Sequence, residues 1–528
     1  MDRNTIIGIV LIFVLFIVWQ QFFVAPEARK QAEEQQRMQD SIALVEQRKD
    51  TSSAPEAVDT IEQAAASAPE PDSIRQLQNS AVYGPFAGAA SGEEQLYTLE
   101  NDVFTVTFSN KGGRVVKAEL KNFNKISENE KKKEIESPLY LLEDDKNKFE
   151  YLLPVAGIAG GVVSTGDLYF TATQSDNSIT FRADAGNGRY FEQKYAVSPG
   201  TYRMDYSLRF EGLNSVFDKD ANKIQLNWLN YLDKLEKNTR YERTYSTAYY
   251  KPVDDNYNYC SYTSNDTENV SGIKIKWVSH SNQFFNSSLV AKESFDGSIL
   301  QVEQLDEEAA DLKKLSTQIN IPYTQSGTET FVMDFYVGPN EFNRLQAIGY
   351  DLEDVIPFGW SIFGTINRWV IRPIFNFLSM FIGSKGLVIL ALTFIVKLLL
   401  YPLTYRMLYS QSKMGALKPQ LEGLRAKHKD DPQQQQMETM KIYREFGVSP
   451  LGGCMPMVLQ MPIWFALYRF FPAAIEFRQA SFLWATDLSS YDVFFRLPFE
   501  IPLGFGSHIS LFTLLCTATT QIYTYYNS

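Results

Sequence analysis

The sequence predicts a multi-domain membrane protein in which a large all-β domain is joined to a core of membrane-spanning α-helices. Four apolar runs are long enough to cross a bilayer, one at the N-terminus and three beyond residue 385. Between them, residues 96–345 alternate polar and apolar residues in short runs, which is typical of an all-β sandwich. With 528 residues, the chain is also too long for a single hydrophobic core.

Residues 1–26 are predicted to form an uncleaved transmembrane anchor. The run Ile6–Val24 is almost wholly apolar. A cleaved signal peptide is the alternative, but Ala25 is followed by Pro26 and no small-x-small cleavage site is evident. Residues 27–95 are rich in Gln, Glu, Ala, Ser and Pro, so we expect a flexible tether, with a polar helix over part of Ala28–Lys49.

Residues 96–345 contain candidate strands without interleaved helices. Val103–Phe108 alternates, and Gly186-Asn187-Gly188 separates two further runs as the turn of a hairpin does. The runs on either side of that turn, and later ones, are Ile179–Ala183, Arg189–Val197, Thr201–Phe210, Ile224–Leu229, Gln283–Val290 and Thr330–Val337. They predict one large β-sandwich domain.

Residues 346–385 are predicted to contain an amphipathic helix that lies in the membrane interface. Within Phe358–Ile382, arginines and tryptophans flank apolar residues, which favours an interfacial helix over a crossing one. Pro373 is expected to kink or break it. The alternative is a buried helix of the β domain.

Three spans follow, over residues 386–404, 451–474 and 507–528, with a polar helical hairpin over 405–450 and an outer loop over 475–506. Asp431-Pro432 is typical of a helix start, and we expect Pro419 to bend the first arm of the hairpin. The hairpin carries eight Lys and Arg residues against five acids, so we expect it in the cytoplasm. The N-terminus is then cytoplasmic, and the β domain lies across the membrane.

Lys397 lies inside the first of these spans, where a charge costs about 2.5–3.5 kcal/mol on insertion scales. Thr393 and Tyr401, four residues to either side, share its helix face. A lone lysine that snorkels to the headgroups is the alternative. The other spans add polar residues that lipid cannot satisfy, so we expect a hydrated cationic groove formed with Gln460, Thr517 and Gln521.

The groove hypothesis also has a purely structural alternative, in which the polar residues form interhelical hydrogen bonds that hold the helices together. Against it, the three spans contain no Asp or Glu to pair with Lys397, which should attract anionic groups of a passing molecule. The second span also contains Met457, Met461 and Trp464, a soft surface that could hold varied apolar helices. Simple packing is the alternative for each methionine.

Several function classes lack their sequence signals. Three cysteines give no disulfide framework, the three histidines lack metal-ligand spacing, and we find no nucleotide-binding or hydrolase motif. We therefore expect no metal, no cofactor and no enzymatic activity. The net charge of −12 argues against nucleic acid as a direct partner.

Several segments resemble the YidC family of bacterial membrane protein insertases. They are Gly386–Pro402 (GLVILALTFIVKLLLYP), Lys413–Pro419 (KMGALKP), Pro450–Tyr468 (PLGGCMPMVLQMPIWFALY), Phe477–Leu488 (FRQASFLWATDL), Trp277–Phe285 and Val337–Pro339. The resemblance runs through nearly the whole chain in order. It implies the Gram-negative type, with a large periplasmic domain.

The resemblance implies an inner-membrane insertase and chaperone that works without nucleotide hydrolysis, alone or with the Sec translocon. Its implied partners are nascent membrane proteins, the ribosome and the phospholipid bilayer. The periplasmic β-sandwich is implied to be mutarotase-like, and the groove to open to the cytoplasm and the bilayer. The groove cation of the family is usually arginine, and Lys397 keeps its charge but lacks the planar fork. The family has five core spans, and this chain ends after three, so we expect a truncated chain.

Two other function classes remain as hypotheses. An anchored carbohydrate-binding or epimerising enzyme predicts a cleft with paired His and Glu, whereas the β domain contains only His280. An ion channel or transporter requires a pore through both faces, which liposome conductance would detect.

Overall fold

The computed structural model describes residues 72–128, 134–359, 361–428, 431–447, 455–501 and 506–527. The predicted anchor over residues 1–26, and the predicted tether as far as residue 71, lie outside these ranges.

The end of the predicted tether is an ordered part of the β domain. Helix α3 (Asp72–Tyr83) leads into the 3-10 helix η2 (Gly84–Ala89), and the Phe86 side chain is fully buried. The backbone N–H of Tyr169 donates to the carbonyl of Ala89 at 2.7 Å. The tether predicted to residue 95 was therefore wrong over its last part, because a polar average conceals one aromatic anchor.

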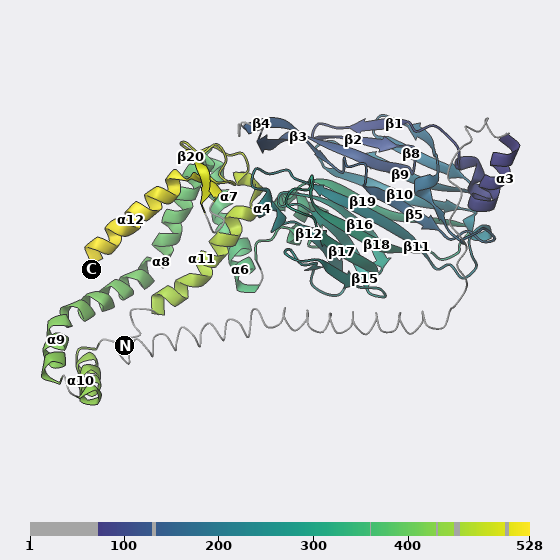
Figure 1. Cartoon of the computed structure of the whole chain (residues 1–528). Helices are drawn as coiled ribbons and strands as arrows, with labels where there is room; N and C mark the ends of the chain where they lie inside the picture. Colours follow the sequence, from purple (N-terminus) through teal and green to yellow (C-terminus); the bar gives the residue numbers. More distant parts are fainter. Residues whose placement is uncertain are drawn as a thin grey trace, which may run out of the picture. The chain divides into compact units, whose positions relative to one another are not determined.

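Among the described residues, three antiparallel sheets build the β domain (Figure 1). The first has the order β1 (Leu96–Glu100), β2 (Phe104–Ser109), β3 (Arg114–Glu128), β4 (Glu134–Leu141). The second has the order β13 (Asn258–Tyr259), β12 (Thr247–Pro252), β15 (Lys274–Ser281), β16 (Phe285–Asp296), β19 (Thr328–Pro339), β10 (Arg203–Glu211), β9 (Tyr190–Val197), β8 (Ser178–Asp184), β7 (Thr171–Gln174). The third has the order β14 (Asp266–Asn269), β17 (Ser298–Gln304), β18 (Asp311–Pro322), β11 (Lys223–Asp233), β5 (Lys148–Leu153), β6 (Val163–Ser164). Short connecting helices are η3 (Thr165–Asp167), η4 (Leu213–Ser215) and α4 (Thr239–Arg243).

The hairpin predicted around residues 186–188 is confirmed as β8 and β9. Ile179 pairs with Tyr195, and both side chains are fully buried, as the period-2 alternation requires. Asn187 has a φ of 56° between two glycines that also have positive φ, a conformation that a tight hairpin turn demands.

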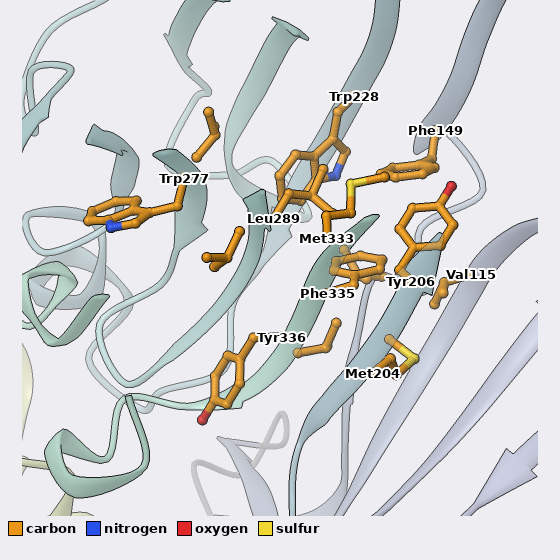
Figure 2. Close-up of a cluster of buried hydrophobic side chains, with 14 of the residues drawn as sticks. Val115, Phe149, Met204, Tyr206, Trp228, Trp277, Leu289, Met333, Phe335 and Tyr336 are labelled. Atoms are coloured by element: carbon orange, nitrogen blue, oxygen red, sulfur yellow. The ribbon is translucent and has the colours of Figure 1, made fainter. Parts of the chain in front are cut away.

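The core lies between the second and third sheets, so the predicted all-β sandwich is confirmed. Figure 2 shows Phe149, Trp228 and Phe335 beside one another in this core. The ring of Phe149, on β5, stacks on that of Phe335, on β19, with centroids 5.6 Å apart. Burying such a side chain stabilises the fold by about 1.5–3 kcal/mol. Two buried hydroxyl groups in this core pair with each other, since those of Tyr151 and Tyr206 lie 2.6 Å apart.

A chain of short helices follows the sandwich: α5 (Phe342–Ile348), η5 (Leu352–Val355), α6 (Ser361–Ile366), the π-helical turn η6 (Asn367–Ile371) and α7 (Arg372–Phe381). Pro373 lies in the first turn of α7, directly after the π turn, so the helix is interrupted where proline predicts it.

The predicted interfacial helix exposes an apolar face but does not expose both arginines to headgroups. Trp369, Met380 and Phe381 are each more than 70% exposed, so this segment is not a wholly buried helix. Arg368 Nη2 lies 2.5 Å from Asp354 Oδ1, and Arg372 donates to Asn343. The arginines therefore bind the short helices η5 and α5, which follow the sandwich.

The helical core consists of α8 (Lys385–Ala416), α9 (Lys418–Lys427), α10 (Pro432–Glu445), α11 (Met455–Ala473) and α12 (Leu511–Asn527), with η7 (Ile475–Phe477), β20 (Phe495–Ile501) and β21 (Gly506–Ile509) between the last two (Figure 1). Within the described residues, one segment, Lys385–Pro402, is long and apolar enough to cross a membrane.

Three boundaries of this core differ from the sequence expectations. Helix α8 runs through Pro402 to Ala416, beyond the predicted end at residue 404. Pro419 does not bend a helix arm but lies in the first turn of α9, where proline fits without loss of a hydrogen bond. Helix α12 begins at Leu511, because His508 belongs to β21.

Candidate functional site

Helix α8 has one buried row at a spacing of four residues. Val388, Leu392 and Val396 are buried, and Leu400 and Thr404 continue the row half-buried. Residues at this spacing lie above one another on a helix, and α8 packs against α7 and α11. The row therefore marks the side of α8 that faces the rest of the protein.

Lys397, Thr393 and Tyr401 form the adjacent row, one residue further round the helix, and all three are exposed. The Thr393 hydroxyl donates to the carbonyl of Ile389, at 2.8 Å. Lys397 has no hydrogen bond or ion pair with any residue that the structure describes. The cation is thus available beside the packing face of α8.

One predicted groove residue joins two helices. The side-chain amide of Gln460, on α11, donates to the hydroxyl of Thr404, on α8, at 3.1 Å. That hydroxyl in turn donates to the carbonyl of Leu400, at 3.0 Å. Gln460 and Thr404 therefore form an interhelical hydrogen bond, and such bonding is one of the two interpretations that the sequence allows for the polar residues.

The polar stripe of α12 stays separate. Thr517 and Gln521 are exposed, and the Thr517 hydroxyl donates to the carbonyl of Thr513, at 2.9 Å, in its own helix. Neither residue contacts Lys397 or Gln460 through a hydrogen bond in the described part of the chain. The helix is instead held at its start, where Leu511 N donates to Asp492 Oδ2 at 2.8 Å.

Helix α11 exposes an apolar and aromatic face. Met461, Trp464 and Tyr468 are 45%, 60% and 64% exposed, and their spacing places them on one side of the helix. The side chain of Met457 lies outside the described residues. Two of the three residues expected to form a soft surface thus lie exposed.

Asn367 links the interfacial segment to α11, a role that sequence reasoning missed. Its side chain is fully buried, and its amide nitrogen donates to the carbonyls of Phe358 and Ala466, each at 2.7 Å. The available signal was one of two asparagines among the apolar residues of the segment, and one of its two partners, Ala466, lies 99 residues further along the chain.

His280 belongs to the core of the β domain. It is 1% exposed, its ring stacks on Trp228 at 3.9 Å, and its Nε2 lies 2.7 Å from the hydroxyl of Thr317. Burial lowers the pKa of His280 to about 3. This histidine is therefore neutral and enclosed, unlike the acid or base of an open carbohydrate cleft.

Some solved structures resemble part of the chain. A galactose mutarotase-like protein from Lactobacillus casei matches with 9% identity and a TM-score of 0.29, over 46% of this chain and 100% of its own. A putative aldose 1-epimerase from Escherichia coli matches with 11% identity and a TM-score of 0.28, over 46% of this chain and 99% of its own. No activity follows from likeness at this level.

Family models and relatives cover the chain. Residues 96–377 match the YidC periplasmic domain, and residues 377–528 match the 60Kd inner membrane protein family. Membrane protein insertases YidC from Parabacteroides distasonis and Phocaeicola vulgatus are 37% and 35% identical over 100% of this chain, which spans 83% and 82% of their lengths. The chain therefore belongs to the YidC family of membrane protein insertases, bacterial inner-membrane proteins with a periplasmic domain.

Proposed function

We propose that this chain inserts nascent membrane proteins into the inner membrane by drawing the acidic tail of a client along a polar surface centred on Lys397. The observation that carries the proposal is the exposed cation of Lys397, which pairs with none of the residues that the structure describes and lies in a segment long and apolar enough to cross the membrane. Thr393 and Tyr401 extend this surface along α8, and Gln460 lies on the neighbouring α11.

The magnitudes favour an electrostatic role. Moving one carboxylate into the middle of a membrane costs about 2.5–3.5 kcal/mol on insertion scales. A cation 4 Å away at an effective dielectric constant of about 20 returns roughly 4 kcal/mol. One lysine can therefore offset the cost of one carboxylate, but not of several.

Snorkelling is compatible with this role. Lys397 is five residues from Pro402, about 7.5 Å along a helix, so its ammonium can approach the cytoplasmic headgroup region. Water drawn to that ammonium shortens the apolar distance that a client tail has to cross.

The client helix is proposed to move along the exposed face of α11 into lipid. Met461 and Trp464 offer apolar contacts without a fixed shape, which suits clients of varied sequence. Burial of the client's own apolar helix supplies the driving force, so nucleotide hydrolysis is not needed. The same proposal includes three further points. The chain works alone or beside the Sec translocon, its helical hairpin contacts the ribosome, and its N-terminus lies in the cytoplasm.

The proposal predicts that insertion depends on the charge at residue 397. In proteoliposomes, Lys397→Glu should reduce insertion of a single-span client with an acidic N-terminal tail at least tenfold. Lys397→Ala should reduce it less, and Lys397→Arg should preserve it. Protease protection of the translocated tail measures the yield.

A matched control uses the other end of α8, where Lys385→Glu makes the same charge change about 18 Å away along the helix axis. This variant should insert the client nearly as well as the parent chain. A client whose tail acids are replaced by Asn and Gln should lose its sensitivity to Lys397→Glu. Equal insertion of the acidic client by Lys397→Glu and the parent chain would refute the electrostatic role.

A further inference from the structure

A buried ion pair joins the segment that follows α11 to the β domain. Arg478 Nε lies 2.7 Å from Glu236 Oε1, with the two side chains only 2% and 11% exposed. The same guanidinium donates through Nη2 to the carbonyl of Asn124, at 2.7 Å, and lies 5.0 Å from the centroid of the Phe285 ring. Such geometry satisfies a charge that would otherwise be costly to bury.

Neighbouring hydrogen bonds strengthen the same junction. The side-chain amide of Gln479 also donates to the carbonyl of Asn124, at 2.6 Å. On the other side, the amide of Gln283 donates to the carbonyl of Pro472, in the last turn of α11, at 2.8 Å. The β domain thus holds both the end of α11 and the residues directly after it.

The covalent connection between the β domain and the interfacial helices is a second, separate attachment. Gly349, Tyr350 and Asp351 all have positive φ, a conformation that non-glycine residues adopt only when contacts enforce it. Here Trp277 Nε1 donates to the carbonyl of Tyr350, at 2.8 Å, and Lys251 lies 3.1 Å from Asp351.

Two attachments restrict a domain far more than one flexible linker does. Trp277 lies on β15 and Gln283 lies in the turn that follows it, so neighbouring parts of the sandwich serve both attachments. Helix α11 is continuous from Met455 to Ala473, so fixing its outer end also fixes the direction in which Met461 and Trp464 point.

We propose that Arg478 is a positioning residue for insertion, which clamps the outer end of α11 to the β domain and so orients the exposed face of that helix towards the client. The β domain then acts as a brace for the insertase core. This inference rests on the client path proposed above for α11.

The test uses the full chain in nanodiscs or proteoliposomes, with hydrogen exchange and client insertion measured on the same variants. Arg478→Ala should raise amide exchange at least tenfold over residues 474–492 and leave β10 and β19 unchanged. Amides there report the clamp because they form local hydrogen bonds, such as Leu488 N to Ala480 O at 3.0 Å. Insertion should fall severalfold.

Arg182→Ala is the matched control. Arg182 also forms a 2.7 Å ion pair, with Glu192, and its guanidinium also lies over an aromatic ring, that of Tyr190. However, Arg182 lies on strand β8, far in sequence from the junction. It should change neither readout. Arg478→Lys, which keeps the charge but not the planar fork, should fall between Arg478→Ala and the parent chain.

A partner variant tests whether the ion pair itself matters. Glu236→Ala alone leaves Arg478 as a buried unpaired charge and should release the same residues. The double variant Glu236→Ala, Arg478→Ala should exchange no faster than either single variant, because neither charge is then left without its partner.

Three outcomes would overturn the inference. Exchange over residues 474–492 that does not change in Arg478→Ala removes the clamp, and acceleration across the whole β domain reduces Arg478 to a stabilising residue. Faster local exchange with normal insertion removes the positioning role. Lys397→Glu should impair insertion without altering amide exchange over residues 474–492. The proposed role of Lys397 and the proposed role of Arg478 can therefore be refuted independently.

Discussion

Single residues could be identified from the sequence when their significance does not depend on a partner. Lys397 stands out because a charge within an apolar span is costly wherever its neighbours lie. Arg478 and Asn367 were not identified from the sequence, because the structural role of each depends on a contact with a residue far away in the sequence. The Arg478 partner, Glu236, lies 242 residues away in the sequence, and no local pattern encodes that pairing.

Asp233 supplies a pH prediction at this scale. Burial raises the pKa of Asp233 from 3.8 to about 7, and nearby acids add to the effect. Because its folded pKa exceeds its unfolded pKa, the folded state binds the extra proton between these values, so stability falls as pH rises from about 4 to 7.

Asp233→Asn should therefore stabilise the β domain at pH 7.5 by about 1–2 kcal/mol, a figure discounted for solvent screening from the rise in the pKa of Asp233 to about 7. The gain should vanish near pH 4, where Asp233 is protonated in the folded chain. Thermal unfolding at both pH values measures it, with Asp205→Asn, at an exposed aspartate on β10, as the control. Equal gains at both pH values would contradict the assignment to Asp233.

Secondary-structure elements followed the sequence closely where periodicity was strong. The β8–β9 hairpin and the start of α10 at Asp431 were predicted correctly, the latter because Asp431 Oδ1 accepts from Gln433 N and Gln434 N. The length of α8 was not predicted, because its apolar run ends near Pro402 while the helix continues in polar residues. Hydropathy marks the membrane-crossing part of a helix and not the end of the helix.

The junction between elements at Asn367 gives a second prediction. Asn367→Ala removes the two donors that join the interfacial segment to α11 and leaves the Phe358 carbonyl without this partner. Leaving a buried acceptor unsatisfied costs about 1–3 kcal/mol. Denaturation in mild detergent, followed by helical circular dichroism, should show this loss.

Asn376→Ala offers a control for that junction, since Asn376 lies on α7 and is only half-buried. It should change the denaturation midpoint by far less. If Asn367→Ala unfolds at the same midpoint as the parent chain, then the two hydrogen bonds do not hold the segment to α11.

For the whole molecule, the sequence correctly predicted a periplasmic β-sandwich followed by a helical core, with the first strand at Leu96, but it missed the ordered helices α3 and η2 that precede this strand. Composition averaged over residues 27–95 indicates a tether, and such averages cannot resolve one anchoring side chain. The grouping of the polar stripes into one groove also exceeds what spacing encodes. The structure joins Gln460 to α8, while Thr517 and Gln521 lie exposed on α12.

The boundary near residue 72 leads to a prediction about the stability of the β domain. Phe86 is fully buried, and η2, which carries it, packs on β8. Phe86→Ala should leave a cavity and cost about 3–5 kcal/mol, enough to lower the unfolding midpoint of the domain by many degrees. Val82→Ala, at a residue 49% exposed in α3, should cost less than about 0.5 kcal/mol. If residues 72–95 were only a tether, both variants would unfold with the parent chain, so comparing the two midpoints decides where the β domain begins.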